Sequence, residues 1–228
     1  MGCAMTEQEW LTYRNPMPML KYLRDRASRR KLRLFGLNCC YHLRHILDHC
    51  GLKALDTAER YIEGLSNSDE LEAARQAAYQ AFYEFDNREG RESAASCIES
   101  LCFPDDDELY LDEITGVSAA EVASRHPRHL FRAMKRLAGL NQSRILRDII
   151  GNPFRRTEND FEWSAWNDGT VPRLAKTIYD DRRFDLMPIL ADALEEAGCD
   201  EANMLDHCRG PGPHVRGCWV VDLLLGKE

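Results

Sequence analysis

Apolar residues recur at intervals of three or four positions along nearly every patterned segment of this chain. The clearest example is the segment 185–198, in which apolar side chains occupy positions 186, 189, 190, 193, 194 and 197. This spacing places them on one face of an α-helix, whereas the side chains of a half-buried strand would alternate with a period of two. We therefore predict an all-α protein, either a multi-helix bundle or an irregular helical stack, with about nine to eleven helices.

Capping and helix-breaking residues set the expected helix boundaries. A short helix around Trp10 precedes a long one that runs to Cys50, is capped by Gly51 and has a break near Ser28 or Gly36. Further helices are predicted within 52–65, 68–85, 93–103, 118–125, 127–139, 141–150, from 170 onward, and within 185–198, 200–208 and 214–225. The last of these ends in a run with two adjacent valines that could form a buried strand, but no partner strand is evident and we favour a helix.

The size of the chain limits its organisation. With 228 residues and 44% hydrophobic content it can form one large domain or two small ones. We expect an N-terminal helical half, 1–126, and a C-terminal helical half, 127–228, packed together as one globular unit.

Composition also indicates a compartment and excludes some partners. No run approaches the roughly 20 apolar residues of a membrane-spanning helix, and the first residues lack the basic and apolar segments of a signal peptide. The nine cysteines are therefore expected to be reduced thiols of a cytoplasmic protein, with no membrane partner. The formal net charge of −8 argues against nucleic acid as a general partner.

The segment from His207 to Cys218 is the main candidate site. It combines His207, Cys208, His214 and Cys218 with a Gly-Pro-Gly-Pro loop, and zinc accepts thiolate and imidazole ligands in tetrahedral geometry. A cysteine nucleophile with one histidine as its base is the enzymatic alternative. Because the spacing lacks the usual paired-cysteine pattern, we favour structural roles for these side chains. No cofactor is predicted, and zinc is the one alternative.

A second set of potential ligands lies on the predicted long helix. Cys39, His42, His45 and His49 are spaced so that the histidines fall near one helix face, and His45 and His49 are four residues apart. A helical zinc-hydrolase motif would also need a glutamate between these two histidines, and none is present. We favour the interpretation that they flank an apolar seam.

A basic stretch covers residues 21–33, with seven basic residues and one acidic residue. Its candidate anion-binding side chains are Arg24, Arg26, Arg29, Arg30, Lys31 and Arg33. On one continuous helix they could bind nucleic acid or a phosphate-bearing partner. A solvated or internally paired face is the interpretation that we favour.

Several segments resemble a known sequence family. They are LRDIIGNPFR at 146–155, WNDGT at 166–170, the segments 178–199 and 207–225, RRKLRLFGLNCC at 29–40 and MTEQEWL at 5–11. Together they resemble an uncharacterised bacterial family of helical proteins that has many paralogues per genome and a C-terminal tail of the HCRGPGPHVRGCWVVDLLLGK type. The resemblance covers about half of the chain. It implies a non-exported bacterial protein but no catalytic residue, since its members have no established activity.

No complete catalytic set is present, so we expect a protein-interaction or scaffolding module that binds an unidentified protein partner. Trp163 and Trp166, in an aromatic-rich segment, are the candidate partner groove, together with His214. One alternative is a metal- or thiol-dependent hydrolase that uses the C-terminal cysteine and histidine cluster. The other is nucleic-acid or anion binding through the basic stretch.

Overall fold

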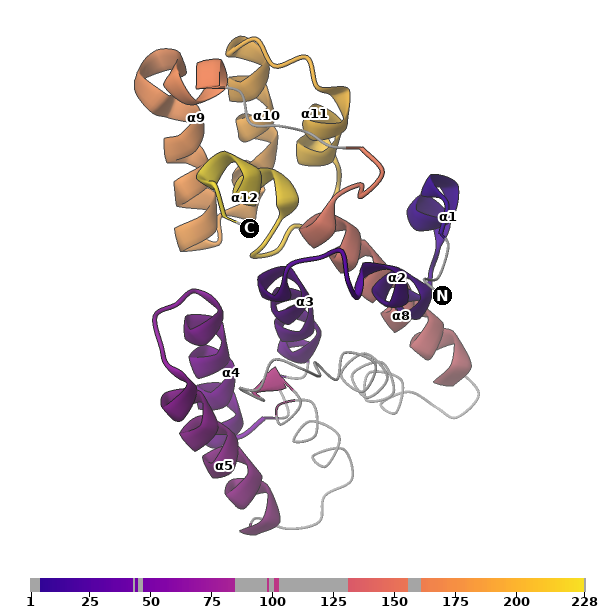
Figure 1. Ribbon diagram of the computed structural model, residues 1–228, viewed down its shortest axis with the longest axis vertical. Coiled ribbons are helices and arrows are strands. Elements are labelled where there is room, and N and C mark those ends of the chain that lie inside the picture. Colours follow the sequence, from indigo (N-terminus) through magenta and orange to yellow (C-terminus); the bar gives the residue numbers. More distant parts are fainter. Residues whose placement is uncertain are drawn as a thin grey trace. The chain divides into compact units, whose positions relative to one another are not determined.

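The computed structural model describes residues 5–42, 44, 47–84, 98, 101–102, 131–155 and 161–227 (Figure 1). These residues form ten α-helices and one short 3₁₀ helix and contain no β-strand. The prediction of an all-α protein is confirmed. None of the described helices combines the length and the apolar composition that crossing a bilayer requires.

The chain divides into two compact units. The first comprises Met1–Met5 and Thr12–Ser143, and the second comprises Thr6–Leu11 and Arg144–Glu228. The predicted boundary between residues 126 and 127 lies outside the described residues. That the two halves pack as one globular unit stays a prediction.

The described part of the first unit contains four helices and the beginning of a fifth. These are α2 (Pro16–Leu23), α3 (Arg29–Tyr41), α4 (His49–Ile62), α5 (Ser68–Glu84) and the first part of α8 (Phe131–Ile150). Helix α4 packs against both α3 and α5, and α4 and α5 lie side by side in Figure 1. Side chains cap the starts of α2 to α5. Asn15 Oδ1 accepts the N–H of Met17 at 3.1 Å, Ser28 Oγ that of Lys31 at 3.3 Å, Asp48 Oδ1 that of Gly51 at 2.8 Å and Asn67 Oδ1 that of Glu70 at 2.9 Å.

The predicted long helix to Cys50 is wrong in its second half. A break does occur near Ser28, which caps α3, but α3 ends at Tyr41 and α4 begins at His49. Gly51 lies in the first turn of α4 and does not cap a preceding helix.

The prediction of separate helices at 127–139 and 141–150 is also wrong, because residues 131–150 form the single helix α8. Gly139 lies inside it. A β-carbon at Gly139 would be 3.4 Å from the carbonyl oxygen of Arg14, so this glycine admits a neighbouring backbone and does not end a helix. Predicted helices at 93–103 and 118–125 fall mostly or wholly outside the described residues.

The second unit is built from the C-terminal elements and one N-terminal helix. These are α1 (Glu7–Thr12), the end of α8, α9 (Phe161–Asp181), η1 (Phe184–Leu186), α10 (Met187–Glu196), α11 (Ala202–Arg209) and α12 (Trp219–Leu225). Helix α9 is interrupted at residues 166–169, where the sequence predicted a turn. The segment 214–218, predicted as helix, precedes α12 as a loop.

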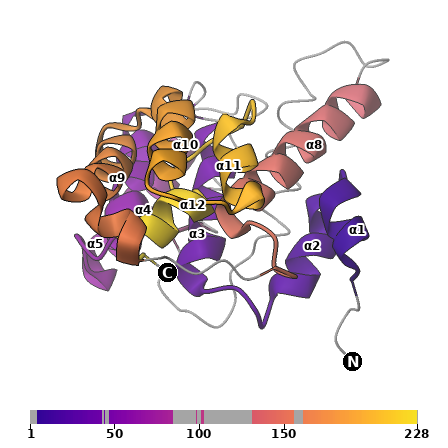
Figure 2. The same cartoon turned by 90° about the horizontal axis from the view of Figure 1, so that it is seen from above.

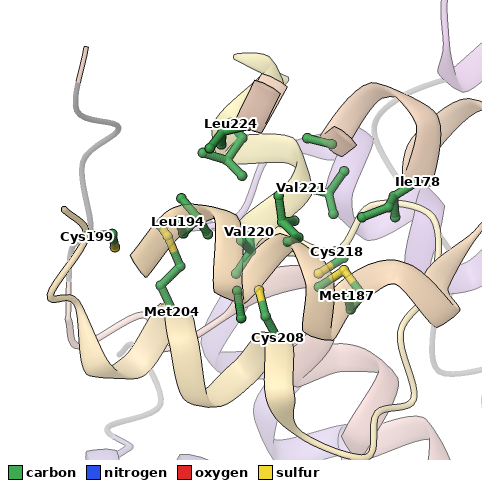
Figure 3. Packing of buried hydrophobic residues seen from close by; sticks show 14 of the residues in the cluster. Ile178, Met187, Leu194, Cys199, Met204, Cys208, Cys218, Val220, Val221 and Leu224 are labelled. Atoms are coloured by element: carbon green, nitrogen blue, oxygen red, sulfur yellow. The ribbon is translucent and has the colours of Figure 1, made fainter. Parts of the chain in front are cut away.

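The core of the second unit lies among its last four helices. Helix α10 packs against α9 and α11, and α12 packs against α9, so the four form one group (Figure 2). Figure 3 shows side chains of these helices directed toward a shared interior. The fully buried members are Val171, Ala175, Ile178, Met187, Leu190, Ala191, Leu194, Met204, Cys208, Cys218 and Val220. This burial fixes α11 and α12, the two elements that flank the 207–218 segment.

Gly151, directly after α8, is enclosed by two tryptophans. Its backbone has φ +73°, and its N–H donates to the carbonyl of Arg147 at 2.8 Å, which ends the helix. A β-carbon here would lie 2.9 Å from Cγ of Trp219. The buried Trp10 donates its indole N–H to the Gly151 carbonyl at 2.9 Å. Only glycine meets both the backbone conformation and the close approach of Trp219.

Gly151→Ala should therefore destabilise the second unit by about 2–5 kcal/mol. The added methyl group is strained in the left-handed backbone conformation and crowds the ring of Trp219. Gly226→Ala is the matched control, since Gly226 has φ +63° with no atom within 4 Å of the added methyl group, and it should cost only about 1–2 kcal/mol. Denaturant unfolding followed by circular dichroism measures both. Equal losses would contradict the role assigned to Trp219.

Candidate metal centre

Four potential metal ligands meet in the second unit. They are Asp148 on α8, His207 on α11, His214 in the following loop and Cys218 immediately before α12. One ligand atom from each lies within 4.8 Å of all the others. Among the described residues, three or more potential ligands come together at this one place.

The carboxylate of Asp148 is the centre of the group. Its Oδ1 lies 2.9 Å from His214 Nδ1 and 3.1 Å from His207 Nε2. His207 Nε2 also lies 3.2 Å from Cys218 Sγ. The Asp148 side chain is 2% exposed, against 9% for His214 and 20% for His207. A buried carboxylate thus faces two imidazole nitrogens, one of which also faces a thiol.

Backbone groups orient the ligand atoms from outside. The N–H of Val215 donates to Asp148 Oδ2 at 2.9 Å, which turns Oδ1 toward the histidines. His214 Nε2 lies 3.3 Å from the carbonyl oxygen of Gly210. With a proton on Nε2 for that carbonyl, a neutral His214 points the lone pair of Nδ1 at Oδ1. Two lone pairs at this distance repel unless a proton or a metal ion lies between them.

The pKa values of Asp148 and His214 are shifted by this arrangement. Burial alone would raise the pKa of Asp148, but hydrogen bonds and charge interactions with His207 and His214 outweigh it and the pKa is lowered. For His214, burial acts to lower the pKa, and the Asp148 carboxylate raises it overall. Both shifts show that the site favours an ionised carboxylate next to a cation.

The two thiols nearby are not activated as nucleophiles. Burial, with a contribution from the Asp148 carboxylate, raises the pKa of Cys208 to about 12. The same two causes raise the pKa of Cys218 well above its ordinary value, although the N–H groups of Val221 and Val220 act in the opposite direction. A thiolate at Cys218 therefore requires a neighbouring cation, and a cysteine hydrolase gains no support from these groups.

The structure brings together three of the four predicted C-terminal residues and excludes the fourth. His207, His214 and Cys218 belong to the group, whereas Cys208 is fully buried in the apolar core. His207 and Cys208 are consecutive on α11, so about 100° of helix rotation separates them. Asp148 was missed by sequence reasoning. Its signal in the sequence was its position three residues after Ile145, which is buried in α8, so that both lie near one helix face.

The described members of the second predicted set do not assemble into one group of ligands. Cys39 is fully buried in α3, and His42 follows that helix with its pKa lowered by burial. His49 begins α4 and, with Cys50, lines a pocket of about 430 Å³ between α4 and α5. His45 lies outside the described residues. Within the part of the chain that the structure describes, these residues make no group of three ligands.

The basic stretch is divided over α2, a turn and α3, because the predicted long helix breaks near Ser28. The Arg26 guanidinium lies 4.5 Å from the ring centroid of Tyr22. Arg30 pairs with Glu63 at 3.3 Å. Arg33 is 4% exposed. Arg24 and Arg29 are exposed, and Lys31 is half-buried. Internal partners thus engage Arg26 and Arg30 of this stretch.

The two tryptophans of the candidate partner groove pack against the protein's own core. Trp163 is 7% exposed and belongs to the core of the second unit, and the partly buried Trp166 packs against that core. Their aromatic surface therefore serves mainly internal packing.

Comparison with known proteins adds no assignment: no family model matches the chain, and no curated protein or solved structure shows significant similarity to it.

Asp148→Asn should destabilise the second unit by about 3–5 kcal/mol, because the amide removes the charge that the histidines face in a buried site. Asp180→Asn is the control. Its carboxylate pairs with Lys176 on an exposed helix face, and its loss should cost at most about 0.5 kcal/mol. Thermal unfolding monitored by circular dichroism compares the two. A loss below 1 kcal/mol for Asp148→Asn would contradict the central role of this carboxylate.

Proposed function

We propose that the second unit is a metal-stabilised helical domain that binds one Zn²⁺ through Asp148, His207, His214 and Cys218. The observation that carries the proposal is the convergence of four donor atoms within 4.8 Å, with two of them directed at one carboxylate oxygen. In a tetrahedral zinc site, bonds of about 2.0–2.3 Å place ligand atoms roughly 3.3–3.6 Å apart. The three short contacts of 2.9–3.2 Å would lengthen by a few tenths of an ångström. The remaining pairs of donor atoms, which lie within 4.8 Å, would adjust to the same spacing.

The donor chemistry selects the ion. One thiolate and two imidazoles with one carboxylate suit Zn²⁺, whereas Mg²⁺ and Ca²⁺ prefer oxygen ligands throughout. The bonds from Val215 and to Gly210 are of the kind that orient ligands in zinc proteins. A metal ion also supplies the cation that a Cys218 thiolate requires.

Four protein donors make the site structural and not catalytic, because they leave no position for a water or a substrate. The ion would join the end of α8 to α11, the loop and α12. A structural ion of this kind favours a protein-interaction or scaffolding role and does not favour a metal-dependent hydrolase. Anion or nucleic-acid binding gains no comparable support, since the basic stretch is divided between two helices and is partly paired.

The zinc content of purified protein tests the proposal. Tag-free protein, dialysed against metal-free buffer, should retain about one zinc ion per chain by elemental analysis. Cys218→Ala should reduce this below roughly one tenth, because the thiolate is a ligand. Cys208→Ala is the matched control, a buried cysteine ten residues away, and should keep the full content. Metal-free wild type, or retention by Cys218→Ala with loss in Cys208→Ala, would refute the site.

Cobalt substitution separates a closed site from an open one. The Co²⁺ protein should show intense visible bands of four-coordinate cobalt and a near-ultraviolet charge-transfer band from the Cys218 sulfur. Added azide or cyanide should leave the visible bands unchanged, because no coordination position is open. A saturable change at millimolar azide would favour the hydrolase alternative instead.

A further inference from the structure

Helix α1 belongs to the second unit although more than a hundred residues separate it from the rest. Two of its residues make the contacts, and we call Glu7 and Trp10 with their partners on 147–155 the α1 clasp. Trp10 is fully buried, and its indole N–H donates to the Gly151 carbonyl at 2.9 Å. In return, Arg147 donates from Nε to the Trp10 carbonyl oxygen at 2.8 Å.

Glu7 extends the clasp along the same short segment. One of its carboxylate oxygens accepts a hydrogen bond from the Asn152 amide at 2.7 Å and another from Arg155 at 2.6 Å. Helix α1 has only six residues. Because isolated helices shorter than about 12 residues are marginal in water, α1 depends on this docking for its structure.

The docking segment is also part of the candidate metal centre. Asp148 follows Arg147 directly, so the residue that holds the Trp10 carbonyl adjoins the central ligand. Gly151 accepts from Trp10 on one side and lies under the ring of Trp219 on the other. Trp219 follows Cys218, and its ring centroid is 5.4 Å from that of His207. Trp219 therefore connects two potential ligands, His207 and Cys218, to Gly151, whose carbonyl accepts from Trp10.

We propose that docking of α1 is coupled to occupancy of the metal centre, so that loss of the ion releases the N-terminal segment. The inference rests on the proposed function. Without the ion, α11, the loop and α12 remain joined to Asp148 only by the hydrogen bonds of His207, His214 and Val215. Trp219 is then held less firmly against Gly151, and the carbonyl that accepts from Trp10 is held less firmly in position. The clasp thus acts as a metal-dependent latch.

Because coupling free energies are reciprocal, the factor by which zinc strengthens docking of α1 equals the factor by which docking of α1 strengthens zinc binding, so a variant that undocks α1 must bind zinc more weakly. Zinc dissociation constants, measured by competition with a chromophoric chelator on the full chain, test this. Trp10→Ala should raise the constant about tenfold, within the usual range of allosteric coupling. Trp10→Phe, which keeps a ring but removes the N–H donor, should have a smaller effect in the same direction. Leu11→Ala is the matched control, since Leu11 lies on the same helix and is 52% exposed, and it should change nothing measurable.

Hydrogen exchange on wild-type protein gives the second measurement. On removal of zinc, amides in the peptide around Trp10 should exchange at least about tenfold faster, whereas those of α4 in the first unit should not change. Equal zinc affinities in wild type, both Trp10 variants and Leu11→Ala would overturn the latch and leave the proposed zinc site intact. If Trp10→Ala does not fold, the zinc dissociation constants of Trp10→Phe and wild type are compared instead. Wild type that binds no zinc would refute the proposed function and the latch together.

Discussion

The buried carboxylate of Asp148 is the interaction on which the second unit depends. Removing an ionised group from water costs several kcal/mol unless partners replace its hydration. Here the partners are His207, His214 and the N–H of Val215, all of which come from a segment about sixty residues later in the chain. Satisfying this one charge thus fixes how the end of α8 meets α11 and the loop before α12.

The sequence predicted the local part of this site and missed its long-range part. His207, His214 and Cys218 were identifiable because they lie within twelve residues of one another beside a stiff loop. Asp148 was not, because only the fold brings α8 to that loop. Cys208 was included wrongly, since proximity in sequence does not specify which side of α11 faces the core. The position of Asp148 three residues after the buried Ile145 was the signal available.

Helix boundaries show the same limit. Periodicity identified most of the described helices, and residue types predicted the turn inside α9, but the helical start of α9 at 161–165 was not predicted and glycine was misinterpreted twice. Gly51 donates its N–H to the Asp48 cap and so belongs to a helix start. Gly139 leaves room for the backbone at Arg14. In both cases the role of the glycine depends on a partner that hydrophobic spacing does not reveal, so local patterns alone could not distinguish a helix end from a close approach.

The Gly-Pro-Gly-Pro run between His207 and Cys218 has an entropic consequence. Pro211 and Pro213 each fix one backbone dihedral in every state of the chain, so the unfolded loop has fewer conformations to lose when its ends come together. A chelating loop that is already restricted holds its donors at a higher effective concentration than a flexible one of equal length. The two prolines would thereby tighten ion capture without contributing a donor atom of their own.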